Sequence, residues 1–174
     1  MGANALAVAG VDLTKTYIPR SGASTVTDVT NLPYSLGTVI SKGAGAQERR
    51  YKFVLAEDAD IEAGDFVCYT TDDNGYEVSE TNGENSCDIL QPAGLALVNI
   101  TDGHCGWIQT YGLNDVAMTG DGSVGTGEGI MPHATTDGMV DTWATDPVKL
   151  CGQALVDDAP ALAVNGVFLN CPKG

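Results

Sequence analysis

The sequence predicts an all-β protein made of short strands. Glycine accounts for 22 of the 174 residues without a G-X-Y period, and a glycine inside a helix costs about 1 kcal/mol relative to alanine. The apolar stretches are short and are separated by glycine, proline, serine and threonine, which are typical of turns. In addition, the acidic part of the chain repeats itself. We therefore expect two tandem copies of a small β-barrel or sandwich unit, preceded by an extended N-terminal arm.

Residues 1–52 differ from the rest of the chain in charge. They hold six basic and three acidic residues, whereas residues 53–174 hold two basic and 20 acidic ones, so that the whole chain carries a formal net charge of −15. Pro19 and Pro33 exclude a helix locally, and the apolar pieces of this segment are short. We interpret residues 1–52 as an extended arm with two short strands. The alternative is that this segment packs back on its own domain as edge strands.

Residues 53–114 and 115–174 are predicted to be the two copies. Three blocks recur at offsets of 63, 58 and 60 residues, a near-constant spacing that indicates a duplication. The matched blocks are AGDFV at 63–67 with TGEGI at 126–130, GLALV at 94–98 with GQALV at 152–156, and GWIQ at 106–109 with GVFL at 166–169.

Each copy has the same predicted order of elements. A turn made of glycine and an acidic residue starts a strand, and a hairpin tip follows at residues 72–75 or 137–138, where Asn-Gly and Asp-Gly supply positive φ angles. Next comes a small apolar strand, whose glycine and alanine would let a neighbouring backbone approach closely. A loop then leads to a last strand, at residues 107–111 or 167–170.

Several patterns that can carry chemistry are better explained by structure. The G-x-G-x-x-G match at 120–125 precedes a stretch too rich in glycine to form the helix that a dinucleotide site needs. His104 and His133 are the two histidines and do not cluster with cysteines at metal-ligand spacing. The acidic tip at 72–75 lacks the long ligand loop of a calcium site. We expect no enzymatic activity, no cofactor and no metal.

Charge, hydropathy and cysteine content restrict the expected binding partners and the cellular compartment. An acidic chain repels phosphate backbones, so we expect no nucleic acid partner. No apolar run approaches the roughly 20 residues of a membrane span, and the N-terminus lacks the basic region of a signal peptide, so we expect neither a membrane nor export. Five cysteines without a C-x-x-C pair predict free, mostly buried thiols in a protein made in a reducing cytoplasm.

Four sequence motifs resemble those of a known family. They are IEAGDFV at 61–67, the turn at 73–75, PAGLALV at 92–98 and GWIQTYG at 106–112. In this pattern of motifs, residues 60–170 resemble the head decoration (cement) proteins of tailed bacteriophages. The resemblance implies a structural virion protein, made in the host cytoplasm, that binds the major capsid protein on the outer capsid surface and stabilises the shell. It also implies a homotrimer, and it has no catalytic residues to transfer.

The basic segment is the expected docking element of such a protein. An extended arm can add a strand to a capsid loop or to a neighbouring subunit, and its positive charge suits an acidic shell. The candidate capsid contacts are Lys15, Tyr17, Arg20, Lys42, Arg49 and Arg50.

The alternative function is a carbohydrate-binding or adhesion module of a phage or bacterial surface structure. Sugars stack on exposed aromatic rings, and Trp107, Trp143 and Tyr111 are the plausible set. We expect Trp107 in the core, because its strand is apolar. Trp143 lies in a looser stretch and is the candidate interface aromatic.

Overall fold

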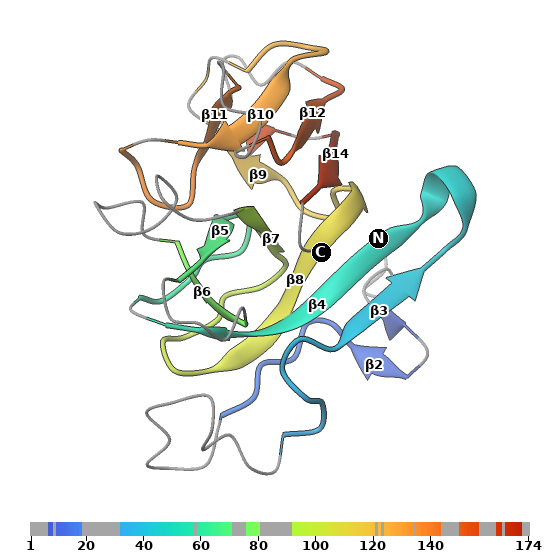
Figure 1. The fold of residues 1–174 in the computed structure, drawn as a ribbon, viewed down its shortest axis with the longest axis vertical. Coiled ribbons are helices and arrows are strands. Elements are labelled where there is room, and N and C mark those ends of the chain that lie inside the picture. Colours follow the sequence, from blue (N-terminus) through green and yellow to red (C-terminus); the bar gives the residue numbers. More distant parts are fainter. Residues whose placement is uncertain are drawn as a thin grey trace.

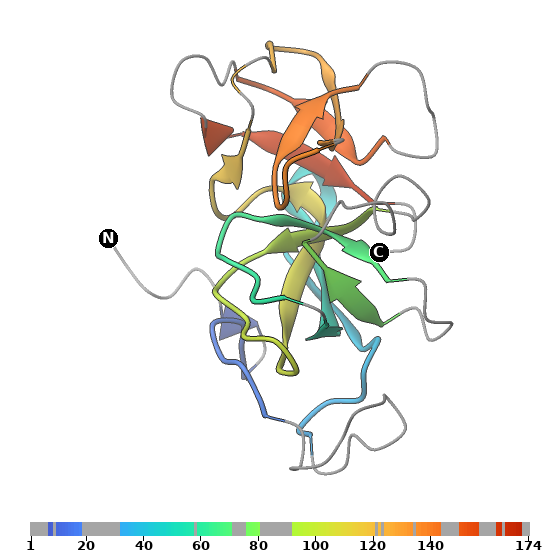
Figure 2. The same cartoon turned by 90° about the vertical axis from the view of Figure 1, so that its left-hand side faces the viewer.

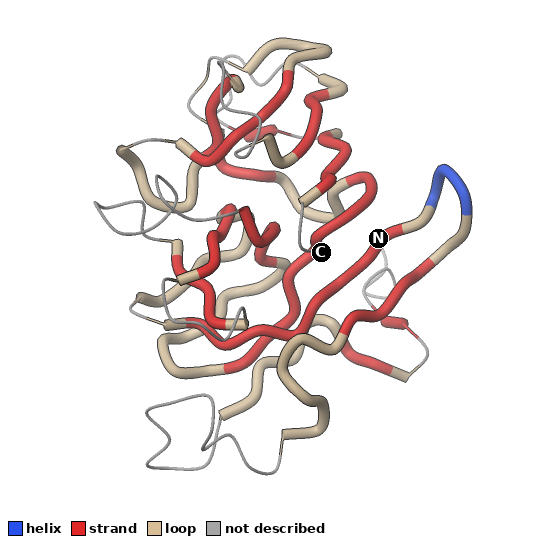
Figure 3. Tube along the Cα trace, viewed as in Figure 1, coloured by secondary structure: helices blue, strands red, loops and turns tan. Residues whose placement is uncertain are grey.

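The computed structural model contains strands throughout the part of the chain that it describes. Within that part, the one other regular element is η3, a single 3-10 turn at Gly45–Gln47. The predicted all-β class is therefore confirmed (Figures 1 and 3). The structure describes residues 7–8, 10–18, 32–57, 59–70, 76–80, 92–120, 122, 124–133, 135–143, 150–156, 163–164 and 166–171.

Five strands close a barrel in the lower part of Figure 1. Strand β5 pairs with β6 and β7, β7 pairs with β8, and β8 pairs with β4. A parallel pairing between β4 and β6 completes the ring. Side chains from all five strands fill the interior, with Val54, Val67 and Ile108 fully buried. The five strands are β4 (Arg49–Ala56), β5 (Phe66–Tyr69), β6 (Glu77–Ser79), β7 (Pro92–Ala96) and β8 (Cys105–Leu113).

A second group of strands repeats this order of pairing. Strand β10 pairs with β11 and β12, and β12 pairs with β14, as β5 pairs with β6 and β7, and β7 with β8. Short strand β9 pairs with β13, and the adjacent Gly120 forms a parallel bridge with Val140 of β11. The strands are β9 (Met118–Thr119), β10 (Gly129–Pro132), β11 (Val140–Thr142), β12 (Gly152–Ala154), β13 (Ala163–Val164) and β14 (Val167–Asn170).

The two groups are joined through a ten-stranded sheet, from which β9 and β13 stand apart as a small sheet, and they share part of their cores. Strand β14 pairs antiparallel with the end of β8, which joins the groups edge to edge, one above the other in Figure 2. The core of the second group also includes Phe66 and Leu95 from the barrel. Asn114 fixes the junction, because its amide donates to the carbonyls of Val116 (2.7 Å) and Val164 (3.1 Å) and accepts from the N–H groups of Gly166 and Val167.

Glycine has the same structural role in the third strand of both groups. A Cβ at Gly94 would lie 2.5 Å from the carbonyl oxygen of Gln109, and one at Gly152 would lie 2.6 Å from that of Phe168. The adjacent backbones can approach so closely only because no side chain lies between them. The close approach expected from the small apolar strands is therefore confirmed.

The extended arm predicted over residues 1–52 is wrong for the part of this segment that the structure describes. Strands β1 (Ala7–Val8) and β2 (Val11–Asp12) form a small hairpin, and Leu13 directly after it is fully buried. Tyr17 forms a backbone bridge to Cys105 of β8, with both N···O distances at 2.8 Å. The boundary placed at residue 52 falls inside β4, so this segment contributes a strand of the barrel.

The physical reason is that β4 is apolar on both faces. Successive side chains of a strand point to opposite faces, so Val54 and Ala56 enter the barrel while Phe53 and Leu55 point outward. The outward side chains need cover from water. N-terminal residues supply it, through Leu13, Tyr17, Leu32, Tyr34 and Leu36.

An aromatic cluster lies at the centre of this contact. The rings of Tyr34 and Trp107 have centroids 5.1 Å apart, and Tyr17 packs edge-on against Phe53 at 5.7 Å. Aromatic pairs in such geometries add about 0.5–1.5 kcal/mol each beyond the area that they bury. The alternative of edge strands packed on their own domain therefore fits the described part of this segment better than an extended arm does.

Candidate functional site

A hairpin projects from the side of the molecule, at the right of Figure 1. It is formed by β3 (Val39–Lys42), the turn η3 and the start of β4, with β3 paired antiparallel to β4. Gly43 has a φ of +79°, and a Cβ there would lie 2.4 Å from the carbonyl oxygen of Gln47. Glycine is thus required for the tight fold of the tip.

Strand β3 is an edge of the ten-stranded sheet in the described part of the chain. The N–H of Phe53 donates to the carbonyl of Thr38 at 2.9 Å. Because hydrogen bonding alternates along an antiparallel pair, the polar backbone groups of Ile40 and Lys42 face β4, whereas those of Val39 and Ser41 point away from it. This outer edge can accept an added strand.

Three of the six candidate capsid contacts lie together on this hairpin. Arg50 pairs with Glu48 at 2.9 Å and lies with its guanidinium 4.9 Å from the ring centre of Tyr111. Lys42, at the other side of the tip, is half-buried. Arg49 is directed inward, because its Nε lies 2.9 Å from a carboxylate oxygen of Asp115 and donates to the carbonyl of Leu113.

The other three candidates do not join this group. Lys15 is exposed and its ammonium lies 5.9 Å from the ring centre of Tyr17. Tyr17 packs in the aromatic cluster, and burial raises the pKa of its hydroxyl. Tyr17 is half-buried and has a packing role in this cluster, and its place among the capsid contacts stays a prediction. Arg20 lies outside the described residues.

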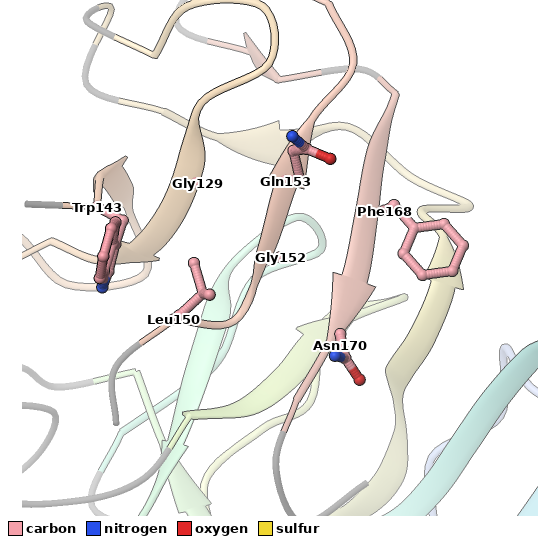
Figure 4. Close-up of a pocket in the computed structure, with 7 residues that line it drawn as sticks. All are labelled: Gly129, Trp143, Leu150, Gly152, Gln153, Phe168 and Asn170. Atoms are coloured by element: carbon pink, nitrogen blue, oxygen red, sulfur yellow. The ribbon is translucent and has the colours of Figure 1, made fainter. Parts of the chain in front are cut away.

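The aromatic candidates are separated in the fold. Trp107 is fully buried, as expected for its apolar strand. Trp143, directly after β11, is half-buried and lines a groove together with Phe168 of β14 (Figure 4). Tyr111 lies outside the lining and packs edge-on against Phe168, with ring centres 5.1 Å apart. Sequence reasoning missed Phe168, although the alternation of Val167, Phe168, Leu169 and Asn170 already predicted that Phe168 and Asn170 share a face.

The histidines stabilise turns. A ring nitrogen of His104 lies 3.1 Å from the carbonyl oxygen of Asp102. The Nδ1 of His133 accepts hydrogen bonds from the backbone N–H groups of Thr135 (3.1 Å) and Thr136 (3.0 Å). Among the described residues, no three His, Cys, Asp or Glu side chains are grouped as a metal site would require. No helix in that same part of the chain is long and apolar enough to cross a membrane.

The cysteines divide into two kinds. Cys105, Cys151 and Cys171 are free and buried, and burial raises the pKa of each thiol, to about 12 for Cys105 and Cys171. Cys68 is disulfide-bonded, so the prediction of free thiols throughout is wrong for this residue. Spacing alone could not reveal this bond, because a disulfide requires the two cysteines to lie close together in the fold.

An acidic cluster lies where the turn after β10 meets the barrel. The backbone N–H of Phe66 donates to the backbone carbonyl of Gly138 (2.8 Å), and the N–H of Gly138 donates to the backbone carbonyl of Glu80 (3.2 Å). Burial raises the pKa of Glu80 to about 8, with further contributions from its hydrogen bond to Asp65 and from the charges of Asp65, Asp137 and Glu62.

Comparison with known proteins gives one structural likeness to report. No family model matches the chain, and no curated protein matches it. The fold is similar to the crystal structure of the head fiber gp8.5 N base in bacteriophage phi29, with a TM-score of 0.44 and 17% sequence identity. The aligned region covers 79% of this chain and 97% of that one.

Proposed function

We propose that this protein is a structural virion protein that binds the outer surface of a phage capsid and stabilises the shell, in contact with the major capsid protein. The observation that carries the proposal is the projecting hairpin. It combines an edge strand with Lys42 and Arg50, in a chain whose net charge is −15. The sequence motifs that resemble those of decoration proteins lie in the all-β body from which this hairpin projects.

In this proposal the protein docks through the projecting hairpin, rather than through the extended N-terminal arm that the sequence suggested. An acidic capsid surface would attract the two basic side chains, and an extended capsid segment would pair with the outward backbone groups of Val39 and Ser41. The acidic remainder of the chain would keep the body soluble and facing solvent. The tip of the hairpin is held against the body of the protein, because Arg49 contacts Leu113 and Asp115. A fixed tip would lose little conformational entropy on docking.

We also propose that the protein acts as a homotrimer. Several weak contacts made at once by a symmetric oligomer bind far more tightly than one contact does. Leu155 and Val156, which follow β12, are 48% and 52% exposed and offer an apolar surface for such contacts. Measurement of the mass of the free protein in solution tests this proposal, and a monomer at micromolar concentration contradicts it.

Co-sedimentation with phage heads tests the docking proposal. Heads of the encoding virus that lack this protein are mixed with the full chain at low and high salt. We expect salt-sensitive binding that falls at least tenfold in Lys42→Glu/Arg50→Glu. The control Lys149→Glu/Lys173→Glu makes the same charge change elsewhere in the chain and should leave binding nearly intact.

A backbone variant tests strand addition separately. Ser41→Pro removes an N–H that points away from β4, so the barrel should keep its thermal stability while head binding falls. Ile40→Pro removes an N–H that faces β4 and should instead lower the stability. Full binding by both the charge variant and Ser41→Pro would show that the hairpin is not the docking element.

A further inference from the structure

A groove of about 430 Å³ lies across strands β10, β12 and β14, in the upper part of Figure 1, and none of its described lining residues belongs to the projecting hairpin. Its size falls within the range of small-molecule sites. The strands bring its residues together through register, since Gly129 lies opposite Gln153 and Gln153 lies opposite Phe168. These contacts join parts of the chain that are up to about 40 residues apart in sequence.

Glycine shapes one end of the groove. A Cβ at Gly129 would lie 2.8 Å from Leu150 Cδ1 and 3.2 Å from the Cβ of Trp143. Because Gly129 has no Cβ, the side chains of Leu150 and Trp143 can both lie over β10. Leu150 is 39% exposed, so this end presents an apolar surface to solvent rather than a closed core.

An aromatic ring lies at each end of the groove. Figure 4 shows Trp143 at one end and Phe168 at the other, with Leu150 and Gln153 between them. The ring of Phe168 packs against that of Tyr111 on the neighbouring strand β8, with centroids 5.1 Å apart and an interplanar angle of 81°. Both lining rings are half-buried, so each is fixed by its neighbours and still reaches the surface.

Amide side chains supply the polar groups. The Nε2 of Gln153 donates to the carbonyl of Gly127 at 2.9 Å, which fixes the orientation of the amide. Within the described chain, its Oε1 has no hydrogen-bond donor, so this oxygen is available to a ligand. Asn170, two residues after Phe168 on β14, adds a second exposed amide to the lining.

This combination selects a ligand class. Aromatic faces bind apolar C–H surfaces, and amides both donate to and accept from hydroxyl groups. None of the described lining residues is charged, so a phosphate, a carboxylate or an ammonium group would find no ionic partner there. The acidic chain would in addition repel an anion. A ligand with apolar faces edged by hydroxyl groups and without charge is a neutral sugar.

We propose that this groove binds a neutral saccharide. A sugar ring would stack on Trp143 or Phe168, and its hydroxyl groups would bond to Gln153 and Asn170. This binding site is separate from the hairpin and goes beyond capsid docking. It would let the protein attach to a glycan-coated surface while the hairpin holds it to another partner.

Glycan binding by the full chain tests the proposal. Neutral oligosaccharides of hexoses and N-acetylhexosamines are screened on an array, with sialylated and sulfated glycans as charged comparisons. Affinities for the positive neutral glycans are then measured by saturation-transfer NMR and tryptophan fluorescence. Because Trp107 is fully buried, we expect the sugar-dependent change of fluorescence to come from Trp143 and to vanish in Trp143→Phe.

Two variants locate the site. Trp143→Ala and Gln153→Leu should each weaken binding about tenfold or more, and Gln153 is exposed enough that its replacement leaves the core intact. Ile18→Ala, which changes an exposed apolar residue outside the lining, should bind normally. Lys42→Glu alone, a charge change on the hairpin outside the lining, should also bind normally, which keeps this result independent of the docking result.

Three results would overturn the proposal. The first is an array on which no neutral glycan binds, with none detected at millimolar concentration by NMR. The second is binding that persists in both groove variants. The third is a loss of oligomer mass in Trp143→Ala, which would show that a second copy of this chain covers the groove.

Discussion

Leu13 provides the sharpest test of how the N-terminal segment is held. Its side chain is fully buried beside Phe53, Leu55 and Trp107, although it precedes the barrel by more than 30 residues. Replacing a fully buried leucine by alanine costs the transfer of the lost carbons and the cavity left behind, about 2.7–5.0 kcal/mol in a well-studied lysozyme series. For a domain of this size, a loss of that order lowers Tm by about 5–20 °C.

Urea and thermal unfolding followed by circular dichroism measure this loss. Leu13→Ala should lower the free energy of unfolding by about 3 kcal/mol or more in a single transition. Ile18→Ala is the matched control, because Ile18 lies five residues later and is 75% exposed; its effect should stay within about 0.5 kcal/mol. A loss below about 1 kcal/mol in Leu13→Ala would refute the packing of this segment on the barrel.

The same packing changes how a truncation must be interpreted. Removal of the N-terminal segment takes away Leu13 and Tyr17, and with them the cover of an apolar barrel face. A truncated chain that fails to bind a capsid would therefore report a damaged body. Point variants of the hairpin are the sound test of docking.

Three further predictions concern the junctions of the fold. Glu80 should make the protein less stable as pH rises from about 4.5 to about 8, because its raised pKa keeps the folded state protonated where the unfolded chain has lost its proton; Glu80→Gln should flatten this dependence in thermal melts. Gly112→Ala should cost about 2–5 kcal/mol in urea unfolding, since φ is +92° and the new Cβ would lie 2.2 Å from the carbonyl oxygen of Glu48. Asn114→Ala should cost about 2–4 kcal/mol by the same assay, because it leaves several partly buried backbone groups unpaired.

Matched controls separate these effects from general ones. Asp102→Asn removes one charge from an exposed turn and should leave the slope of stability against pH nearly unchanged. Gly103→Ala introduces a side chain at a φ of +71° with no atom within 4 Å, so it should cost about 1–2 kcal/mol, the left-handed strain alone. A pH slope that Glu80→Gln leaves intact, or equal losses at Gly112 and Gly103, would contradict the reasoning.

Local pattern was sufficient for the class of structure and for several of its details. Glycine-rich turns and short alternating strands predict an all-β chain, because these preferences act between near neighbours in sequence. The glycines at 94 and 152 were expected to permit close backbone approach, and both do so. The core position of Trp107 also followed from the apolar residues beside it.

Pairing between strands far apart in sequence decided how the N-terminal segment packs and where the groove forms. The positive charge of residues 1–52 suggested a separate arm, yet Phe53 and Leu55 require cover on the outer face of β4, and only the closed barrel reveals that face. The groove likewise depends on register, because Gly129, Gln153 and Phe168 become neighbours only when three strands pair. The sequence by itself determined which segments extend and where they turn, since those are local choices of backbone. Which strands meet, and therefore which side chains share a surface, was decided by the burial of apolar area across the whole chain.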